Sequence, residues 1–240
     1  MNKTSGFTLV ELAIVLMIIG LLIGGILRGQ ELMENSRVSS TIQQVIAYTG
    51  AKTSFTDSYS SMPGDLPTAM ARIPGCTTAN NCGNGNGDGR VGALFADPTS
   101  IIQSGITAIP QVETSYFWKH MALAHLISGI NPSAAITTPS WGDALPEAKI
   151  GGGFNIFYSP TVGDWGTGHV IRLQTGPTTI GSQGTMPISP IRARQLDEKM
   201  DDGMPDRGSV TADFEGTNCD NGGVYQNTEQ KNCIMFFNIE

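Results

Sequence analysis

The sequence predicts an α+β fold in which one long N-terminal helix packs on a small antiparallel sheet with additional helices. An apolar run begins near the N-terminus, and no proline occurs from Met1 to Ser61. These two observations indicate one continuous helix. Short apolar segments separated by Gly and Pro fill the rest of the chain and indicate strands joined by turns.

Composition excludes several classes of protein. The chain has 240 residues, of which 40% are hydrophobic and 15% are charged, and its formal net charge is -7. This hydrophobic content excludes a disordered acidic chain, and the negative charge excludes a basic nucleic-acid-binding protein. Nucleic acid is therefore not an indicated partner. The length is sufficient for one or two domains with a buried core.

The apolar run from Phe7 to Leu27 has the length of a membrane span. It holds 16 large apolar residues or Ala among its 21 positions, and Glu11 is its only charged residue. A hydrocarbon core of about 30 Å needs about 20 helical residues. A cleaved secretory signal fits poorly because its apolar core is only about 7 to 15 residues long and precedes a small-residue cleavage site. A plain membrane anchor fits the length but leaves Glu11 unexplained, since a charge near mid-membrane costs about 2.5 to 3.5 kcal/mol.

The residues around Glu11 form a recognisable motif. The segment Gly6-Phe7-Thr8-Leu9-Val10-Glu11-Leu12 follows a short polar leader. It resembles the class III signal of type IV pilins and type II secretion pseudopilins. The resemblance implies that prepilin peptidase cuts between Gly6 and Phe7 and methylates Phe7. It also implies that Glu11 of one subunit meets the N-terminal amine of a neighbour during filament assembly, whereas the alternative is that Glu11 merely snorkels to the membrane interface.

The same resemblance implies the function. It predicts a structural subunit of a type IV pilus or a type II secretion pseudopilus, with no enzymatic activity and no required cofactor. The implied partners are like or related pilin subunits, prepilin peptidase and the assembly platform in the inner membrane. The alternatives are a minor subunit that initiates or tips the filament and, in a different class, a membrane-anchored periplasmic enzyme.

Four segments follow from these patterns. We expect a leader at 1–6, a transmembrane half-helix at 7–27, a periplasmic half-helix at 28–57 and a globular pilin-like domain at 58–240. Lys3 precedes the span and suits a single-pass protein with its N-terminus inside, although Arg28 directly follows the span. The domain then faces the periplasm before the subunit joins a filament.

The upper half of the helix is predicted to present an apolar stripe to the domain. Its members recur at three- and four-residue spacing and are Val38, Ile42, Val45 and Thr49. We expect the helix to continue to about Thr56. Pilins usually have a helix-bending proline in this region, which is absent here. The glycines that offer weak points instead are Gly20, Gly24, Gly25 and Gly29.

Turn and capping signals place the later elements. The Pro63-Gly64 pair predicts a turn. We expect a second helix at about 114–128, capped by Thr114 or Ser115, and a third helix from Pro190 to about Asp201. The predicted strands are Phe154–Tyr158, His169–Gln174 and Cys233–Asn238.

Several short segments also resemble a recurring group of uncharacterised bacterial pilin-like proteins. This resemblance supports kinship among pilin-like proteins and implies no ligand. The segments are Met62–Asp65, Asn84–Gly89, Trp118–Ala124 and Leu196–Pro205.

The four cysteines suit an oxidising compartment. Their spacing suggests two local bridges, Cys76 with Cys82 and Cys219 with Cys233, each contributing about 2 to 4 kcal/mol. Four cysteines allow three connectivities, and the sequence does not choose among them. A zinc site is the rival interpretation, but no paired C-x-x-C is present.

One loop matches the beginning of a calcium-binding loop. Asn84, Asn86 and Asp88 place oxygen-bearing side chains at alternate positions, as calcium loops do. The twelfth position is Phe95 rather than the usual Glu, so the alternative is a plain flexible loop. Asp97 lies nearby and offers a further oxygen ligand if the loop does bind calcium. A second acidic group fits either a cation site or a solvated helix end, and its members are Asp197, Asp201, Asp202 and Asp206.

Enzyme motifs are absent from the sequence. The histidines are His120, His125 and His169, without an H-E-x-x-H pattern, and neither G-x-S-x-G nor a P-loop occurs. The glycines at 151–153 precede a strand rather than a helix, so they do not form a phosphate-binding loop.

Overall fold

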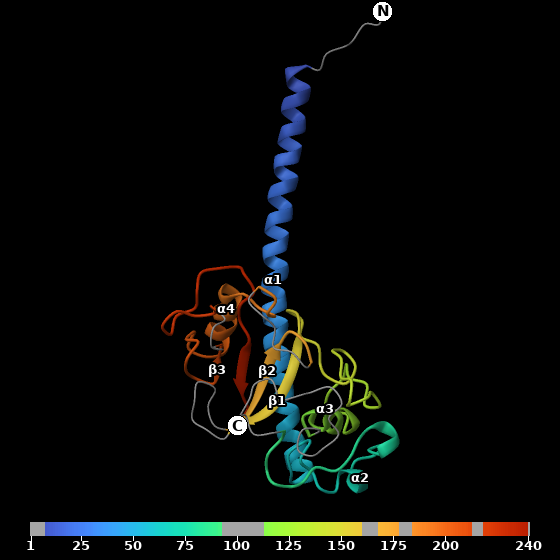
Figure 1. Cartoon of the computed structure of the whole chain (residues 1–240). Coiled ribbons are helices and arrows are strands. Elements are labelled where there is room, and N and C mark those ends of the chain that lie inside the picture. Colours follow the sequence, from blue (N-terminus) through green and yellow to red (C-terminus); the bar gives the residue numbers. More distant parts are fainter. Residues whose placement is uncertain (1–7, 93–112, 160–167, 178–183, 213–217, 240) are drawn as a thin grey trace, which may run out of the picture. The chain divides into compact units, whose positions relative to one another are not determined.

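The computed structural model describes residues 8–92, 113–159, 168–177, 184–212 and 218–239 (Figure 1). The chain forms two compact units, Met1–Arg37 and Val38–Glu240. The helices are α1 (Leu9–Tyr59), α2 (Ala69–Arg72), a short 3-10 helix (Thr78–Asn80), α3 (Glu113–Leu123) and α4 (Pro190–Met200). The strands are β1 (Gly153–Ser159), β2 (Gly168–Gln174), β3 (Val210–Thr211) and β4 (Met235–Asn238).

Helix α1 is continuous over 51 residues and contributes to both units. It passes through all four glycines that the sequence offered as weak points. By length and composition it is long and apolar enough to cross a membrane. The helix ends at Tyr59, three residues beyond the expected end, where Ser60 adopts a left-handed conformation with φ 55°. The predicted segment boundaries at residues 27 and 57 stay predictions.

The second unit buries one face of α1. Val38, Ile42 and Val45 are buried as expected, but Thr49 is only half-buried, and its hydroxyl donates a hydrogen bond to the carbonyl of Val45 at 3.0 Å. Tyr48 occupies the core position that was predicted for Thr49. Both residues lie on the helix face of Val45, because they follow it by three and four positions on a helix of 3.6 residues per turn. The complete buried set is Val38, Thr41, Ile42, Val45, Tyr48, Ala51 and Phe55.

The sheet is antiparallel, with strand order β1-β2-β4-β3. The first two predicted strands, β1 and β2, are confirmed, each with one or two more residues, and nearly every side chain in them is buried. The last strand begins at Met235 rather than Cys233, which instead makes an isolated bridge to Ile188. Strand β3 was not predicted because two residues carry no alternation pattern. The rings of Tyr48 and Phe154 meet edge to face, so helix α1 and the sheet share one core. The α+β prediction is confirmed.

Helix α3 is shorter than predicted. It begins at Glu113, so Thr114 and Ser115 lie within its first turn instead of capping it. Its end at Leu123 is a Schellman motif, in which Leu126 N–H donates to the Met121 carbonyl and His125 N–H to the Ala122 carbonyl. His125 holds the left-handed position with φ 57°, where glycine is usual. The apolar pattern beyond residue 123 suggested more helix because it gave no sign of this turn.

Replacing His125 with Gly is expected to stabilise the protein by about 1 kcal/mol. A left-handed conformation costs a residue with a Cβ roughly 1 to 2 kcal/mol, and the added freedom of glycine in the unfolded chain offsets part of the gain. The midpoint of chemical denaturation measures the change. His125→Ala is the matched control, because it removes the ring but keeps the Cβ, and an equal gain in that variant would contradict the explanation.

Candidate functional site

Three of the segments singled out in the sequence meet in the second unit. The imidazole of His120 on α3 accepts a hydrogen bond from Gly64 N–H at 2.9 Å through Nδ1. Its Nε2 lies 3.0 Å from the carbonyl oxygen of Gly83. His120 therefore carries its proton on Nε2, is neutral, and joins the turn after α1 to the loop that precedes Asn84.

The Gly-rich loop wraps around the carboxylate of Asp65. Asp65 Oδ1 accepts the N–H groups of Gly87 at 2.7 Å and Asp88 at 3.1 Å, and Oδ2 accepts the N–H of Gly89 at 2.9 Å. At Gly85 a Cβ would lie 2.4 Å from Asp65 Cα, so only glycine fits there. Close approach to the backbone of Asp65 thus explains Gly85, whereas Gly87 and Gly89 hold positive φ angles of 76° and 80° that favour glycine.

The side-chain oxygens of the predicted calcium ligands accept backbone N–H groups, two of them within the loop and one in α2. Asn84 Oδ1 accepts Met70 N–H, Asn86 Oδ1 accepts Asp88 N–H, and Asp88 Oδ1 accepts Arg90 N–H, each at 2.9 Å. Calcium binding by these three side chains stays a prediction. The nearby Phe95 and Asp97 lie outside the described residues.

Glu113 belongs to the same site, although sequence reasoning missed it. Its Oε1 accepts the N–H of Asn86 at 2.8 Å, and its side chain is 0% exposed. Burial, together with the charges of Asp65 and Asp88, raises the pKa of Glu113 to about 7. No motif marks this residue, because a Glu at the beginning of a helix is common on electrostatic grounds alone.

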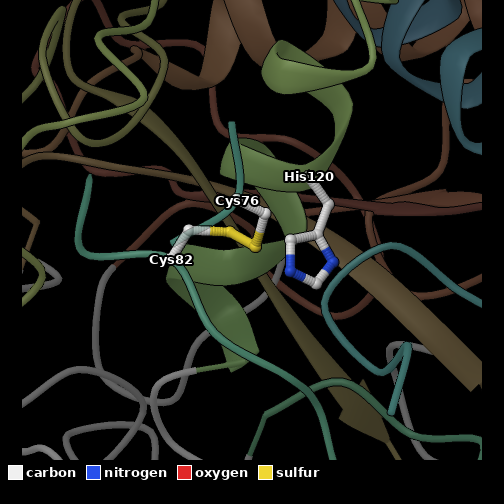
Figure 2. Close-up of side chains that lie close together, drawn as sticks. All are labelled: Cys76, Cys82 and His120. Atoms are coloured by element: carbon white, nitrogen blue, oxygen red, sulfur yellow. A yellow bond between two sulfur atoms is a disulfide. The ribbon is translucent and has the colours of Figure 1, made fainter. Parts of the chain in front are cut away.

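A second cluster joins Cys76, Cys82 and His120, whose ligand atoms lie within 4.8 Å of one another (Figure 2). The structure pairs Cys76 with Cys82 and, elsewhere, Cys219 with Cys233. Disulfide sulfurs are not thiolates, and both nitrogens of His120 are hydrogen-bonded. This arrangement offers no ligand set for zinc, and the imidazole packs beside a structural disulfide.

The buried imidazole makes stability depend on pH. Burial lowers the pKa of His120 to about 4, compared with about 6.5 in an unfolded chain. Between these two pH values the folded state binds fewer protons than the unfolded chain. The stability that the neutral imidazole contributes is therefore complete above about pH 6.5 and is lost as the pH falls to about 4.

We expect the stability advantage of the wild type over His120→Gln to shrink by roughly 2 to 3 kcal/mol between about pH 7 and pH 4. Denaturant titrations of both proteins at each pH measure it. The buried acids Glu113 and Asp197 are present in both proteins and so cancel in the comparison. A difference that does not change with pH would contradict a neutral, buried His120.

The acidic residues at the end of α4 accept hydrogen bonds from the segments that follow the helix. Oxygens of Asp197, Asp201 and Asp202 lie within 4.8 Å of one another. Asp197 accepts the hydroxyl of Tyr225 at 2.7 Å, and Asp201 accepts Val210 N–H at 3.1 Å. Asp201 and Asp202 are exposed, as a solvated helix end requires, but Asp197 is 0% exposed. Burial raises the pKa of Asp197 to about 6.

At the N-terminus, Thr8 and Glu11 form a capping box. Glu11 Oε2 accepts the backbone N–H of Thr8 at 2.8 Å and the hydroxyl of Thr8 at 2.9 Å. In return, Glu11 N–H donates to Thr8 Oγ1 at 3.3 Å. This reciprocal arrangement satisfies backbone donors that the first turn leaves free, and it explains why α1 begins at Leu9. The Thr-x-x-Glu spacing could have revealed the motif.

Comparison with known proteins identifies this N-terminal segment. Residues 1–27 match a family described as the prokaryotic N-terminal methylation motif. The chain carries a type IV pilin-like prepilin signal. It is thereby marked as a pilin- or pseudopilin-type substrate of prepilin peptidase. Neither the curated proteins nor the solved structures contain a match to the chain.

The prepilin signal places the expected scissile bond two residues before the first helical residue. Gly6 and Phe7 themselves lie outside the described residues, whereas Thr8 and Glu11 lie within them. The signal, the long apolar helix and the small antiparallel sheet together give an α+β, pilin-like protein suited to membrane anchoring.

Proposed function

We propose that this protein is a structural subunit of a type IV pilus or a type II secretion pseudopilus. In this proposal, prepilin peptidase cuts between Gly6 and Phe7 and methylates the new N-terminus, and subunits then assemble through α1. The observation that carries it is the prepilin signal followed by a span whose only charged residue is Glu11.

Electrostatics gives Glu11 a role in assembly. Cleavage creates an ammonium group at Phe7, within or beside the membrane, where an unpaired charge is costly. Glu11 lies four residues further along the chain and is the only acidic residue of the span. In the described part of the chain, the hydrogen bonds of its carboxylate all involve Oε2, which leaves Oε1 available for the ammonium of a neighbouring subunit.

The capping box supports this arrangement. Thr8 holds one carboxylate oxygen and so fixes the direction of the other. A subunit that leaves the membrane for a filament core has lost its lipid and water contacts, so a fixed carboxylate facing a neighbour's ammonium selects the register between the two helices.

The proposed location and partners follow from the anchor. The protein is placed in the inner membrane with its N-terminus inside and its second unit in the periplasm, until it moves to the filament. Its partners are prepilin peptidase, the assembly platform in the inner membrane, and like or related pilin subunits. Two disulfides suit the periplasm.

A minor subunit that initiates or tips the filament is the second candidate within this class. The second unit spans Val38–Glu240, which is large for a subunit repeated along a thin pseudopilus. A membrane-anchored periplasmic enzyme would instead act independently of Glu11 and of processing.

Co-expression with prepilin peptidase tests the processing step. The intact mass of the membrane-extracted protein is expected to correspond to residues 7–240 with one added methyl group and two disulfides. Gly6→Leu blocks access to the bond with a bulky side chain and is expected to leave the full-length mass. A wild-type protein that keeps its first six residues in the presence of active peptidase would overturn the proposal.

A further inference from the structure

Two buried carboxylates lie side by side in the second unit. Asn86 N–H donates to Glu113 Oε1 at 2.8 Å, and the N–H of the next residue, Gly87, donates to Asp65 Oδ1 at 2.7 Å. Consecutive backbone groups therefore hold the two side chains, and the two charges interact, because the charge of Asp65 contributes to the raised pKa of Glu113. Glu113 is 0% exposed and Asp65 is 2% exposed, so water does little to screen one charge from the other.

The described residues supply no ion-pair partner for these two carboxylates. In the part of the chain that the structure describes, no ion pair involves Asp65, Glu113 or the adjacent Asp88. Two basic residues of the same segments are otherwise engaged: the guanidinium of Arg90 lies over the Tyr158 ring at 5.0 Å, and His120 is neutral. Buried carboxylates without a cation are costly, so the site requires another positive charge or a proton.

Oxygen atoms remain available at this site. Glu113 Oε2 is buried and makes no hydrogen bond of normal geometry, although the N–H of Gly92 lies close enough to the carboxylate to lower its pKa. The hydroxyl oxygen of the next residue, Thr114, is likewise buried and has no hydrogen-bond partner. Asp65 Oδ2 accepts only the N–H of Gly89, although a carboxylate oxygen has two lone pairs. The three N–H groups around Asp65 fix its orientation and favour its charged form, which offsets part of the rise in pKa that burial causes, so the carboxylate is preorganised to bind a cation.

We propose that Asp65 and Glu113 bind a divalent cation, with Asp65 Oδ2 and Glu113 Oε2 as direct ligands and Asp88 contributing through bound water. Calcium fits best, because it accepts six to eight oxygen ligands in flexible geometry, including backbone carbonyls and waters. The ligands differ from those predicted from the sequence, because Asn84 and Asn86 use their side-chain oxygens to accept backbone N–H groups. The bound ion would fasten the Gly-rich loop to α3.

Calorimetric titration of calcium into the full-length, metal-free protein in detergent tests the proposal. The wild type is expected to bind one calcium ion, with a rise in Tm of roughly 5 to 10 °C at a concentration 100-fold above Kd. Glu113→Gln keeps the acceptor for Asn86 N–H and is expected to bind calcium at least about 10-fold more weakly. Asn84→Ala and the remote Asp202→Asn are the controls, and both are expected to keep wild-type affinity.

Three results would overturn the proposal: no calcium binding by the wild type, equal affinity in Glu113→Gln, or lost binding in Asp202→Asn. Loss of affinity in Asn84→Ala alone would assign the ion to the ligands predicted from the sequence. Should Glu113→Gln fail to fold, the exposed residue Asp88 provides a second variant. Asp88→Asn is expected to weaken binding about 3-fold or more, and unchanged affinity there would contradict the electrostatic contribution of Asp88.

Discussion

Replacing Glu11 with Val is expected to abolish filament assembly while membrane insertion and cleavage continue. The substitution makes the span more apolar, so insertion is not impaired. It leaves the ammonium of a neighbouring Phe7 without a carboxylate in the helical core, and an unpaired buried charge costs about 3 to 5 kcal/mol. This energy corresponds to roughly a 100-fold or greater loss of subunits from the filament. The ratio of sheared filament protein to membrane protein measures it.

Thr8 provides the matched control for this prediction. Thr8→Ser keeps the hydroxyl that donates to Glu11 Oε2 and is expected to assemble normally, whereas Thr8→Val has a similar shape without the hydroxyl and is expected to assemble less well. Normal filaments from Glu11→Val would refute the pairing. A defect in cleavage rather than assembly would assign Glu11 to recognition by the peptidase.

Replacing Asp65 with Ala is expected to destabilise the second unit by roughly 2 to 4 kcal/mol. The change removes the shared acceptor of three backbone N–H groups in the Gly-rich loop. The N–H groups of Gly87 and Gly89 lose their acceptor, at about 1 to 3 kcal/mol for each, whereas Asp88 N–H keeps Asn86 Oδ1 as a partner. Relief of the repulsion with Glu113 offsets part of this loss. Denaturant unfolding of the full-length protein in detergent, with a chelator present, measures the effect without any contribution from calcium.

Asp57 is the control for Asp65. It is exposed and lies near the end of α1, so Asp57→Ala is expected to change stability by no more than about 0.5 kcal/mol. Asp65→Asn keeps one carbonyl acceptor and is expected to fall between the two variants. A cost for Asp65→Ala as small as that for Asp57→Ala would show that the loop does not depend on this carboxylate.

Much of the fold could be predicted because its signals are local. The apolar run, the proline-free helix and the apolar strands β1 and β2 are each contiguous in the sequence, and Pro190 marks the beginning of α4. The errors occur where tertiary contacts or single conformations decide. Strand β3 exists only through its pairing with β4, and α3 ends because His125 adopts a left-handed conformation that the sequence does not announce.

The candidate site divides in the same way. The prepilin signal is a contiguous motif and could be read directly, including the carboxylate at Glu11. The site around Asp65 brings together residues that are 20 to 50 positions apart in the sequence. No local sequence pattern therefore connects Asp65 with Glu113, or the glycines of the loop with either residue. The Asn-Gly-Asn-Gly-Asp-Gly sequence suggested ligands in its side chains, whereas the structure uses its backbone N–H groups to hold a carboxylate from another segment.

The central claim is that a processed chain enters a filament through α1. Isolating sheared filaments from cells that make the wild-type protein, and solving their helical structure by electron cryomicroscopy, tests it most directly. The account predicts α1 in the filament core, with Glu11 of one subunit paired to the N-terminal amine of Phe7 in a neighbour. Filaments that lack this chain, while the processed protein stays in the membrane, would contradict it.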